Sequence, residues 1–382
     1  MSSPTELERS NLQGISKMEN RGYWRLERIA FLALSTLKGI GYRTLYKIAQ
    51  SGVSFNSALR NPIEAGLGKY ISTSQADQFE EQKKLWEAGL AEAKKLALLK
   101  VSLLFKRETR FPNKLSSIPD SPEWIFVQGN IDNLYAPAMA IVGTRKPTDD
   151  GIFLTKFLVA ALAHQKCVTV SGLALGIDQT AHIESLRYGI PTIAVLGTGI
   201  CENYPRGSES LRSEIIRQGG TIISEYLPNQ SYSSENFVRR NRLQAALAEI
   251  LFPTEWQIKS GTAHTVKFAY RYDKKIINLH MPITGLRKPE LAFSEKSYGA
   301  ISLEIPRDTN FLIGLATLYT EHNNTHIPEP PEHLLPDENG LFDIPLQDEN
   351  RLEALNAELS EEEQKEKEQH VNEENDPQLP LL

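Results

Sequence analysis

The segment Thr169–His182, which reads TVSGLALGIDQTAH, has the composition of a turn that binds an anion. A short apolar run ends at Ser171 and Gly172, and Gly176-Ile177-Asp178 then opens a stretch with helical character. A turn between a strand and a helix leaves main-chain N–H groups free, and these groups can hold a phosphate. Gly172 permits a tight turn, and Ser171 adds a hydroxyl group. We therefore expect an anion-binding loop here.

Comparable turns follow other apolar runs of the chain. Arg145 brings a positive charge to the first of them, and Lys259 brings one to the last. Small residues at such turns allow the backbone to approach a phosphate closely. A tight turn with an exposed arginine is the alternative interpretation of the first. The predicted phosphate-binding residues at these turns are Gly143, Thr144, Arg145, Ser171, Gly172, Gly197, Thr198, Gly199, Lys259, Ser260, Gly261 and Thr262.

Three arginines, Arg239, Arg240 and Arg242, stand within four residues at the start of a predicted helix. Guanidinium groups form forked hydrogen bonds with phosphate and stack on bases, so we expect at least two of them to contact a nucleic acid. A salt-bridged surface is the alternative. Asn241 is a candidate base contact or a buried residue that holds a loop. The loop tyrosines Tyr204, Tyr226 and Tyr232 either stack on bases or pack their loops.

Asp178 and His182 are four residues apart and share one face of a predicted helix. They have the chemistry of a catalytic or metal-binding pair. One histidine and one carboxylate do not complete a metal site, and no third ligand has a suitable spacing. We expect Asp178 to cap its helix and the pair to be structural, with no metal and no cofactor. Cys201 is expected to pack rather than to act as a nucleophile.

Short apolar runs alternate with amphipathic stretches between residues 138 and 279. This alternation predicts a parallel sheet covered by helices on both faces, whose ligands bind at the carboxyl ends of the strands. The predicted strands are Met139–Val142, Val168–Val170, Thr192–Leu196, Thr221–Ser224, Ile250–Pro253 and Ile276–Leu279. The predicted helices are Asp150–His164, Ile177–Tyr188, Glu209–Gln218, Phe237–Ala248 and Thr262–Tyr272.

Four further segments flank this region. Leu26–Ala49 has helical periodicity interrupted by Lys38-Gly39-Ile40-Gly41, which resembles a helix-hairpin-helix unit; a small bundle that binds nothing is the alternative. Gln75–Lys100 predicts a helix, and Trp124–Gln128 predicts a strand within a proline-rich connector. The stretch beyond Leu279 is less regular. The predicted domains are 1–25 (flexible), 26–105 (helical), 106–325 (sheet-containing) and 326–382 (disordered and acidic).

The charge of the chain is unevenly distributed. Residues 328–382 contain 17 acidic and 3 basic residues, whereas the remainder contains 31 acidic and 39 basic residues, a net charge of +8. A basic body favours a polyanionic partner, although ordinary surface charge would look the same. Only Cys167 and Cys201 are cysteines, and neither lies in a CxxC motif, which is typical of a reducing compartment. With no apolar leader and no long apolar run, we expect a cytoplasmic protein without membrane association.

Residues 140–277 resemble the DprA/Smf family of bacterial DNA processing proteins. The motifs AIVGTRKPTDDG, SGLALGIDQTAH, TIAVLGTGICENYP, ISEYLP and NFVRRNRLQA occur in that family's order, and FPNKLSSIPD precedes them. The chain departs from the family pattern in having Leu175 where arginine is frequent, and KSGTAHT where SGSLITA is usual. An acidic tail also stands in place of a small winged-helix domain.

The resemblance implies an α/β fold: an extended Rossmann-like parallel sheet with helices on both faces, preceded by an all-helical domain and followed by a disordered acidic tail. It implies a cytoplasmic homodimer that binds single-stranded DNA without catalysis and loads the RecA recombinase during natural transformation or recombination. The alternative is a nucleotide sensor or a LOG-type nucleotide phosphoribohydrolase, but Thr265 occupies the position of that enzyme's catalytic glutamate. The C-terminal QLPLL resembles a sliding-clamp docking peptide; an inert or self-inhibitory tail is the alternative.

Overall fold

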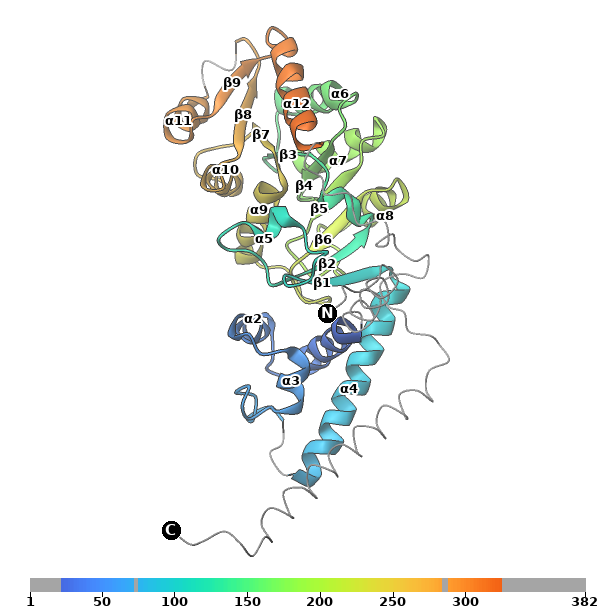
Figure 1. Cartoon of the computed structure of the whole chain (residues 1–382). Helices are drawn as coiled ribbons and strands as arrows, with labels where there is room; N and C mark the ends of the chain where they lie inside the picture. The colour runs from blue at the N-terminus through green and yellow to red at the C-terminus, as the bar shows by residue number, and fades with distance from the viewer. Residues whose placement is uncertain (1–21, 72–74, 284–287, 325–382) are drawn as a thin grey trace, which may run out of the picture. The chain divides into compact units, whose positions relative to one another are not determined.

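The computed structural model of the chain describes residues 22–71, 75–283 and 288–324 (Figure 1). The predicted acidic tail, its QLPLL end and most of the predicted flexible N-terminus lie outside the described residues. Among the described helices, none combines the length and the apolar composition needed to cross a membrane.

A single mixed sheet forms the centre of the protein, with the strand order β1-β2-β6-β5-β4-β3-β7-β8-β9. In this order the seven strands from β6 through β5, β4, β3, β7 and β8 to β9 are parallel to one another. β2 pairs antiparallel with both β6 and β1 and so adds an antiparallel edge. This confirms the predicted parallel sheet. The strands are β1 (Val101–Phe105), β2 (Trp124–Gly129), β3 (Ala138–Gly143), β4 (Val168–Ser171), β5 (Thr192–Val195), β6 (Thr221–Ser224), β7 (Ile250–Glu255), β8 (Lys275–His280) and β9 (Ile301–Glu304).

Helices cover both faces of the sheet, because apolar side chains leave its central strands on both sides (Figure 1). One core packs α5 (Asn113–Ser116), α9 (Ser234–Leu247) and α10 (Gly261–Arg271) on the strands. The other core packs α6 (Asp149–Leu162), α7 (Ile177–Arg187) and α12 (Thr309–Asn324). The remaining elements of this region are η1 (Ile131–Leu134), α8 (Glu209–Arg217) and α11 (Pro289–Tyr298).

The carboxyl ends of the parallel strands form one edge of the sheet, where the loops that follow β3, β4, β5, β6 and β7 meet. The chain first builds β4, β5 and β6 to one side of β3, and β7 then returns to its other side. The strand order therefore switches between β3 and β7, the place where open α/β sheets commonly bind ligands. This edge contains all of the predicted phosphate-binding turns.

A helical module precedes the sheet and packs against its β1–β2 edge. It consists of a helix over residues 22–36, α2 (Tyr42–Ser51), α3 (Phe55–Arg60) and α4 (Gln75–Leu98). Phe31 of the first helix lies 4.8 Å from Trp124 of β2, measured between ring centroids. The buried Arg28 also donates from Nε to the carbonyl oxygen of Leu103, at 2.7 Å. Aromatic packing and this buried arginine fix the module to the sheet.

The structure departs from the expected boundaries in two places. The sheet begins with β1 at Val101, inside the segment expected to be helical, because VSLLF is buried along its whole length. The stretch beyond β8, expected to be less regular, contains α11, β9 and α12. Buried Leu303 of β9 and buried Leu312 and Ala316 of α12 extend the core on the α6 face.

Candidate functional site

The turn after β4 holds an anion, but the anion is a side chain of the protein itself. The carboxylate of Asp178 accepts hydrogen bonds from the main-chain N–H groups of Ala174 and Gly172. Burial raises the pKa of Asp178, and Arg240 and these N–H groups oppose the rise. The helix start lacks a side-chain cap, so Asp178 holds the loop before α7 rather than capping the helix as expected. These N–H groups are therefore not available to an external phosphate.

The hydrogen-bonding groups of the turn after β3 are likewise bonded within the protein, in this case by Glu255, the last residue of β7. The main-chain N–H of Thr148 donates to Oε2 at 2.8 Å, and the Thr148 hydroxyl donates to Oε1 at 3.1 Å. The N–H of Thr144 is also used, because it donates to the Glu255 carbonyl oxygen at 2.8 Å. A carboxylate at the N-terminus of α6 is electrostatically favourable. Glu255 thus fills the switch point between β3 and β7 and fixes the loop that carries Arg145.

The three arginines of α9 do not form one cluster, because successive helical residues are turned by about 100° from one another. Arg240 points under the sheet edge and is only 3% exposed. Its Nη1 donates to the carbonyl oxygens of Gly172, at 2.8 Å, and of Val195. A side chain at Gly172 would collide with this guanidinium, so the glycine is required for the close approach. Arg240 joins two strand ends in the interior of the protein, where a nucleic acid does not reach it.

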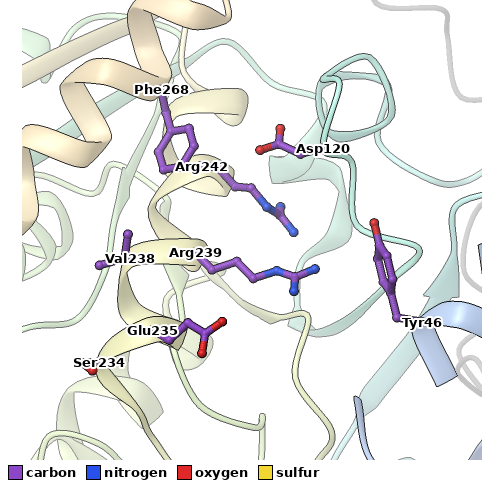
Figure 2. A pocket seen from close by; sticks show the side chains of 8 residues that line it. All are labelled: Tyr46, Asp120, Ser234, Glu235, Val238, Arg239, Arg242 and Phe268. Atoms are coloured by element: carbon purple, nitrogen blue, oxygen red, sulfur yellow. The ribbon is translucent and has the colours of Figure 1, made fainter. Parts of the chain in front are cut away.

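Arg239 and Arg242 extend from another face of α9 (Figure 2). Both are paired with the carboxylate of Glu225. Arg242 is paired with Glu225 through Nη2 and is 2% exposed, whereas the Arg239 side chain is 35% exposed. Nη2 of Arg239 donates to the hydroxyl of Tyr42 at 2.7 Å, and that hydroxyl donates to Glu225 at 3.0 Å. This network connects α2 of the helical module with α9, and it leaves Arg239 partly accessible to solvent.

Three aromatic rings lie together at the carboxyl edge, and we call them the aromatic platform: Tyr204 and Phe237, which are half-buried, and Tyr232, which is exposed. The ring of Tyr204 lies 4.6 Å from that of Tyr232 and 5.0 Å from that of Phe237. The guanidinium of exposed Arg145 lies 5.3 Å from the Phe237 ring centroid. Tyr232 is 58% exposed, so its ring is accessible to a ligand.

Residues beneath the platform hold it in position. Gly197 after β5 lies directly against the Phe237 ring, which any side chain at residue 197 would displace. Arg212 of α8 donates to the carbonyl oxygens of Glu202 and Ile200, at 2.5 and 2.6 Å, and so orders the loop that carries Tyr204. The buried hydroxyl of Tyr226 donates to the carbonyl oxygen of Asn236 at 2.9 Å. Of the three loop tyrosines considered from the sequence, Tyr226 packs its loop, Tyr204 is half-buried and Tyr232 is exposed.

The other predicted phosphate-binding residues are largely committed to internal contacts. The hydroxyl of buried Ser171 donates to the carbonyl oxygen of Ile141 at 2.6 Å and is not exposed at the turn. The Gly199 N–H donates to Gln230 at 2.8 Å, and the Thr198 carbonyl oxygen accepts from Ser224. Asn241 Nδ2 donates to the Gly261 carbonyl oxygen at 3.1 Å. Gly143 packs on Ile177, Ser260 caps α10 and Thr262 is buried, whereas Lys259 and Gly261 remain exposed.

Asp178 and His182 do not act as a pair in this structure. Nδ1 of His182 lies 2.8 Å from the hydroxyl oxygen of Thr192, and the imidazole is completely buried. Burial, with a smaller contribution from Arg240, lowers the pKa of His182 to about 3. A buried imidazole that stays neutral at ordinary pH has no access to a substrate. Within the described ranges, no group of three or more His, Cys, Asp or Glu residues is arranged to hold a metal ion.

Sequence reasoning missed Phe237 and Glu255. Phe237 precedes the arginine run by two residues, and its spacing of three from Arg240 places both on the same side of α9. This helical spacing was the signal that could have separated the arginines. Glu255 ends β7 and so had to lie at the sheet edge, but nothing local in the sequence shows which N–H groups it would meet.

Comparison with known proteins places this arrangement in a family. A family model for DNA recombination-mediator protein A matches residues 102–294. Protein Smf of Synechocystis is 37% identical over 173 residues, which are 44% of this chain and 43% of that protein. The chain thus matches less than half the length of that relative.

Two solved structures are also similar. DNA processing protein A from Streptococcus pneumoniae superposes with a TM-score of 0.56 and 24% identity, over 76% of this chain and 97% of that one, and so supports the fold. DNA processing protein A from Helicobacter pylori, described for its single-stranded DNA binding mode, gives a TM-score of 0.50 and 28% identity over 58% of this chain and 99% of that one. Because the family model covers just over half of the chain, this protein belongs to the DNA recombination-mediator protein A family, that is, to the DprA/Smf proteins.

Proposed function

We propose that this protein binds single-stranded DNA at the carboxyl edge of its sheet through the aromatic platform and Arg145. The observation that carries the proposal is the exposed guanidinium of Arg145 over the half-buried ring of Phe237, beside Tyr204 and Tyr232. Bases stack on aromatic rings without regard to sequence, and arginine adds a contact to the phosphate or the base. In a duplex the bases are already stacked and paired, so the platform favours single strands.

Charge and kinship support this proposal. Arg145, Lys146 and Arg206 are exposed on the loops that carry or adjoin the platform. They can neutralise phosphates on either side of a stacked base. The related protein from Helicobacter pylori is described as binding single-stranded DNA, and its match covers nearly all of that chain.

Family membership supports a proposal for the wider role. We propose that the bound strand is delivered to the RecA recombinase in the cytoplasm during recombination or natural transformation, by a homodimer and without catalysis. Two residues support a binding role rather than catalysis. Thr265 is buried and occupies the position of the catalytic glutamate of LOG-type enzymes, and His182 is buried away from any substrate. Docking of QLPLL on a sliding clamp stays a prediction from the sequence.

The proposal is tested by fluorescence anisotropy with a labelled oligothymidylate. Phe237→Ala should weaken binding by about 5- to 150-fold, since one base–aromatic stack contributes about 1–3 kcal/mol. Tyr270→Ala is the matched control: Tyr270 is an exposed aromatic residue near the carboxyl-terminal end of α10, so it lies away from the platform. It should bind as the parent does. Equal binding by the parent and Phe237→Ala would refute the site.

A further inference from the structure

A pocket of about 540 Å³ lies beside α9, and it is separate from the aromatic platform (Figure 2). Its walls include Arg239, Arg242 and Val238 from α9, Phe268 from α10, Asp120 from the connector and Tyr46 from α2. None of the platform residues is among its lining residues. This volume lies within the range of pockets that hold small molecules.

Arg242, which lines this pocket, has one guanidinium nitrogen without a hydrogen-bond partner. Its side chain is 3% exposed and is paired with Glu225 through Nη2, whereas Nη1 has no partner among the described residues. Figure 2 shows its guanidinium extending into the same space as that of Arg239. A buried donor left unsatisfied costs about 1–3 kcal/mol, so an acceptor supplied by a ligand would be favoured here.

The charges beside this donor also favour an anionic group. Arg239 and Arg242 share one carboxylate, that of Glu225, with Arg239 Nε at 3.8 Å from Oε1. Glu235, which also lines the pocket, is paired with Arg43 at 3.5 Å. The guanidinium groups of Arg43, Arg239 and Arg242 therefore stand against the carboxylates of Glu225 and Glu235 and leave a positive charge at this end of the pocket. Guanidinium groups hydrogen-bond phosphate oxygens in forked geometry.

The remaining walls suit a nucleobase. Tyr46 and Phe268 offer aromatic faces for stacking. Asp120 accepts a hydrogen bond from the hydroxyl of Tyr272, and a carboxylate at this wall can also accept from the exocyclic amine of a base.

We propose that this pocket binds a nucleotide, with its phosphate at Arg239 and Arg242 and its base against the aromatic wall. A free nucleoside monophosphate and one nucleotide of a DNA strand present the same chemistry, and the experiment below separates them. The inference does not depend on the aromatic platform, because Phe237 and Val238 are on different sides of α9 and either can be changed alone.

The test uses the full chain and isothermal titration calorimetry with dCMP, deoxycytidine and inorganic phosphate. We expect dCMP to bind at least about tenfold more tightly than either fragment, because only dCMP engages both ends of the pocket. Val238→Trp should fill the pocket and abolish dCMP binding, whereas Val238→Ala and Phe237→Ala should retain it. Arg239→Gln should weaken dCMP binding about tenfold or more, because it removes one charged hydrogen bond to the phosphate.

The result differs if the pocket binds one nucleotide of a DNA strand rather than a free nucleotide. In that case dCMP does not bind, but Val238→Trp weakens the binding of a labelled oligodeoxycytidylate relative to Val238→Ala. Arg239→Gln weakens the binding of this strand as well. The inference is overturned if dCMP binding survives Val238→Trp and Arg239→Gln, or if dCMP does not bind and neither variant changes strand binding. Failure of the proposed function shows up elsewhere, as strand binding that is unaffected by Phe237→Ala.

Discussion

Acidification should destabilise the folded protein through His182. The imidazole is fully buried, its Nδ1 lies 2.8 Å from the Thr192 hydroxyl oxygen, and its pKa is lowered to about 3. The unfolded chain holds the same histidine in water, where its pKa is about 6.5. Below pH 6.5 the unfolded state therefore binds a proton that the folded state excludes.

The sign and size of the effect follow from proton linkage. Because the pKa in the folded state is depressed, stability is lost as the pH falls below about 6.5, and the loss continues until the pH reaches about 3. Each unit of pKa difference corresponds to about 1.4 kcal/mol, so the loss between pH 7.5 and 5.5 is about 1 kcal/mol. At pH 4.5 it reaches about 3 kcal/mol.

The assay is urea denaturation at a series of pH values, comparing the parent with His182→Gln. Glutamine keeps a polar group near Thr192 but does not titrate, so the variant is expected to be less stable at neutral pH and to lack this component of the pH dependence. The difference between the two proteins cancels the carboxylates and the other histidines. Parallel pH profiles for parent and variant would refute the reasoning and would mean that His182 can be protonated in the folded state.

Three further predictions follow from the carboxyl edge. Arg240→Met should lower the free energy of unfolding, measured by urea denaturation, by about 3–5 kcal/mol, because Asp178 loses its buried counter-charge. Arg239→Met, at the next residue, should lower it by less than about 1 kcal/mol. Equal losses in the two variants would contradict the separation of the two faces of α9. Glu255→Gln should speed amide hydrogen exchange at Thr148 and weaken oligothymidylate binding; unchanged exchange would mean that the carboxylate does not hold the loop. Arg145→Ala should reduce the slope of log affinity against log salt by about 0.7, one phosphate contact, and an unchanged slope would exclude that contact.

The sheet and its helices could be predicted because their apolar periodicities are local. Runs such as Val168–Val170 and Ile250–Pro253 are buried on both sides, and buried strands are apolar at every position. The strand β9, with the sequence ISLE, carries no such pattern: only Leu303 is buried in it. The boundary at β1 was missed because VSLLF directly follows a helix, and only its pairing with β2 makes it a strand.

The gathering of the predicted turns could also be predicted, since the carboxyl ends of parallel strands must meet at one edge. What failed was the assignment of partners. The sequence marks Gly172 and Thr144 as candidates for anion binding, and the structure supplies the anions from Asp178 and from Glu255, which is more than a hundred residues away from Thr144. The arginines of α9 looked equivalent in the sequence, but their helical phases direct Arg240 inwards and leave Arg239 partly exposed.

The most direct test of the account is whether a base stacks on the aromatic platform. Tyr232→Trp places an indole on the exposed side of the platform, and Tyr270→Trp places one in the control position near the end of α10. On titration with oligothymidylate, the fluorescence of the Tyr232→Trp protein should be quenched beyond that of the parent, since stacking on a base brings the indole into contact with it. The Tyr270→Trp protein should respond as the parent does. Strand binding with equal quenching in the two variants would contradict the account.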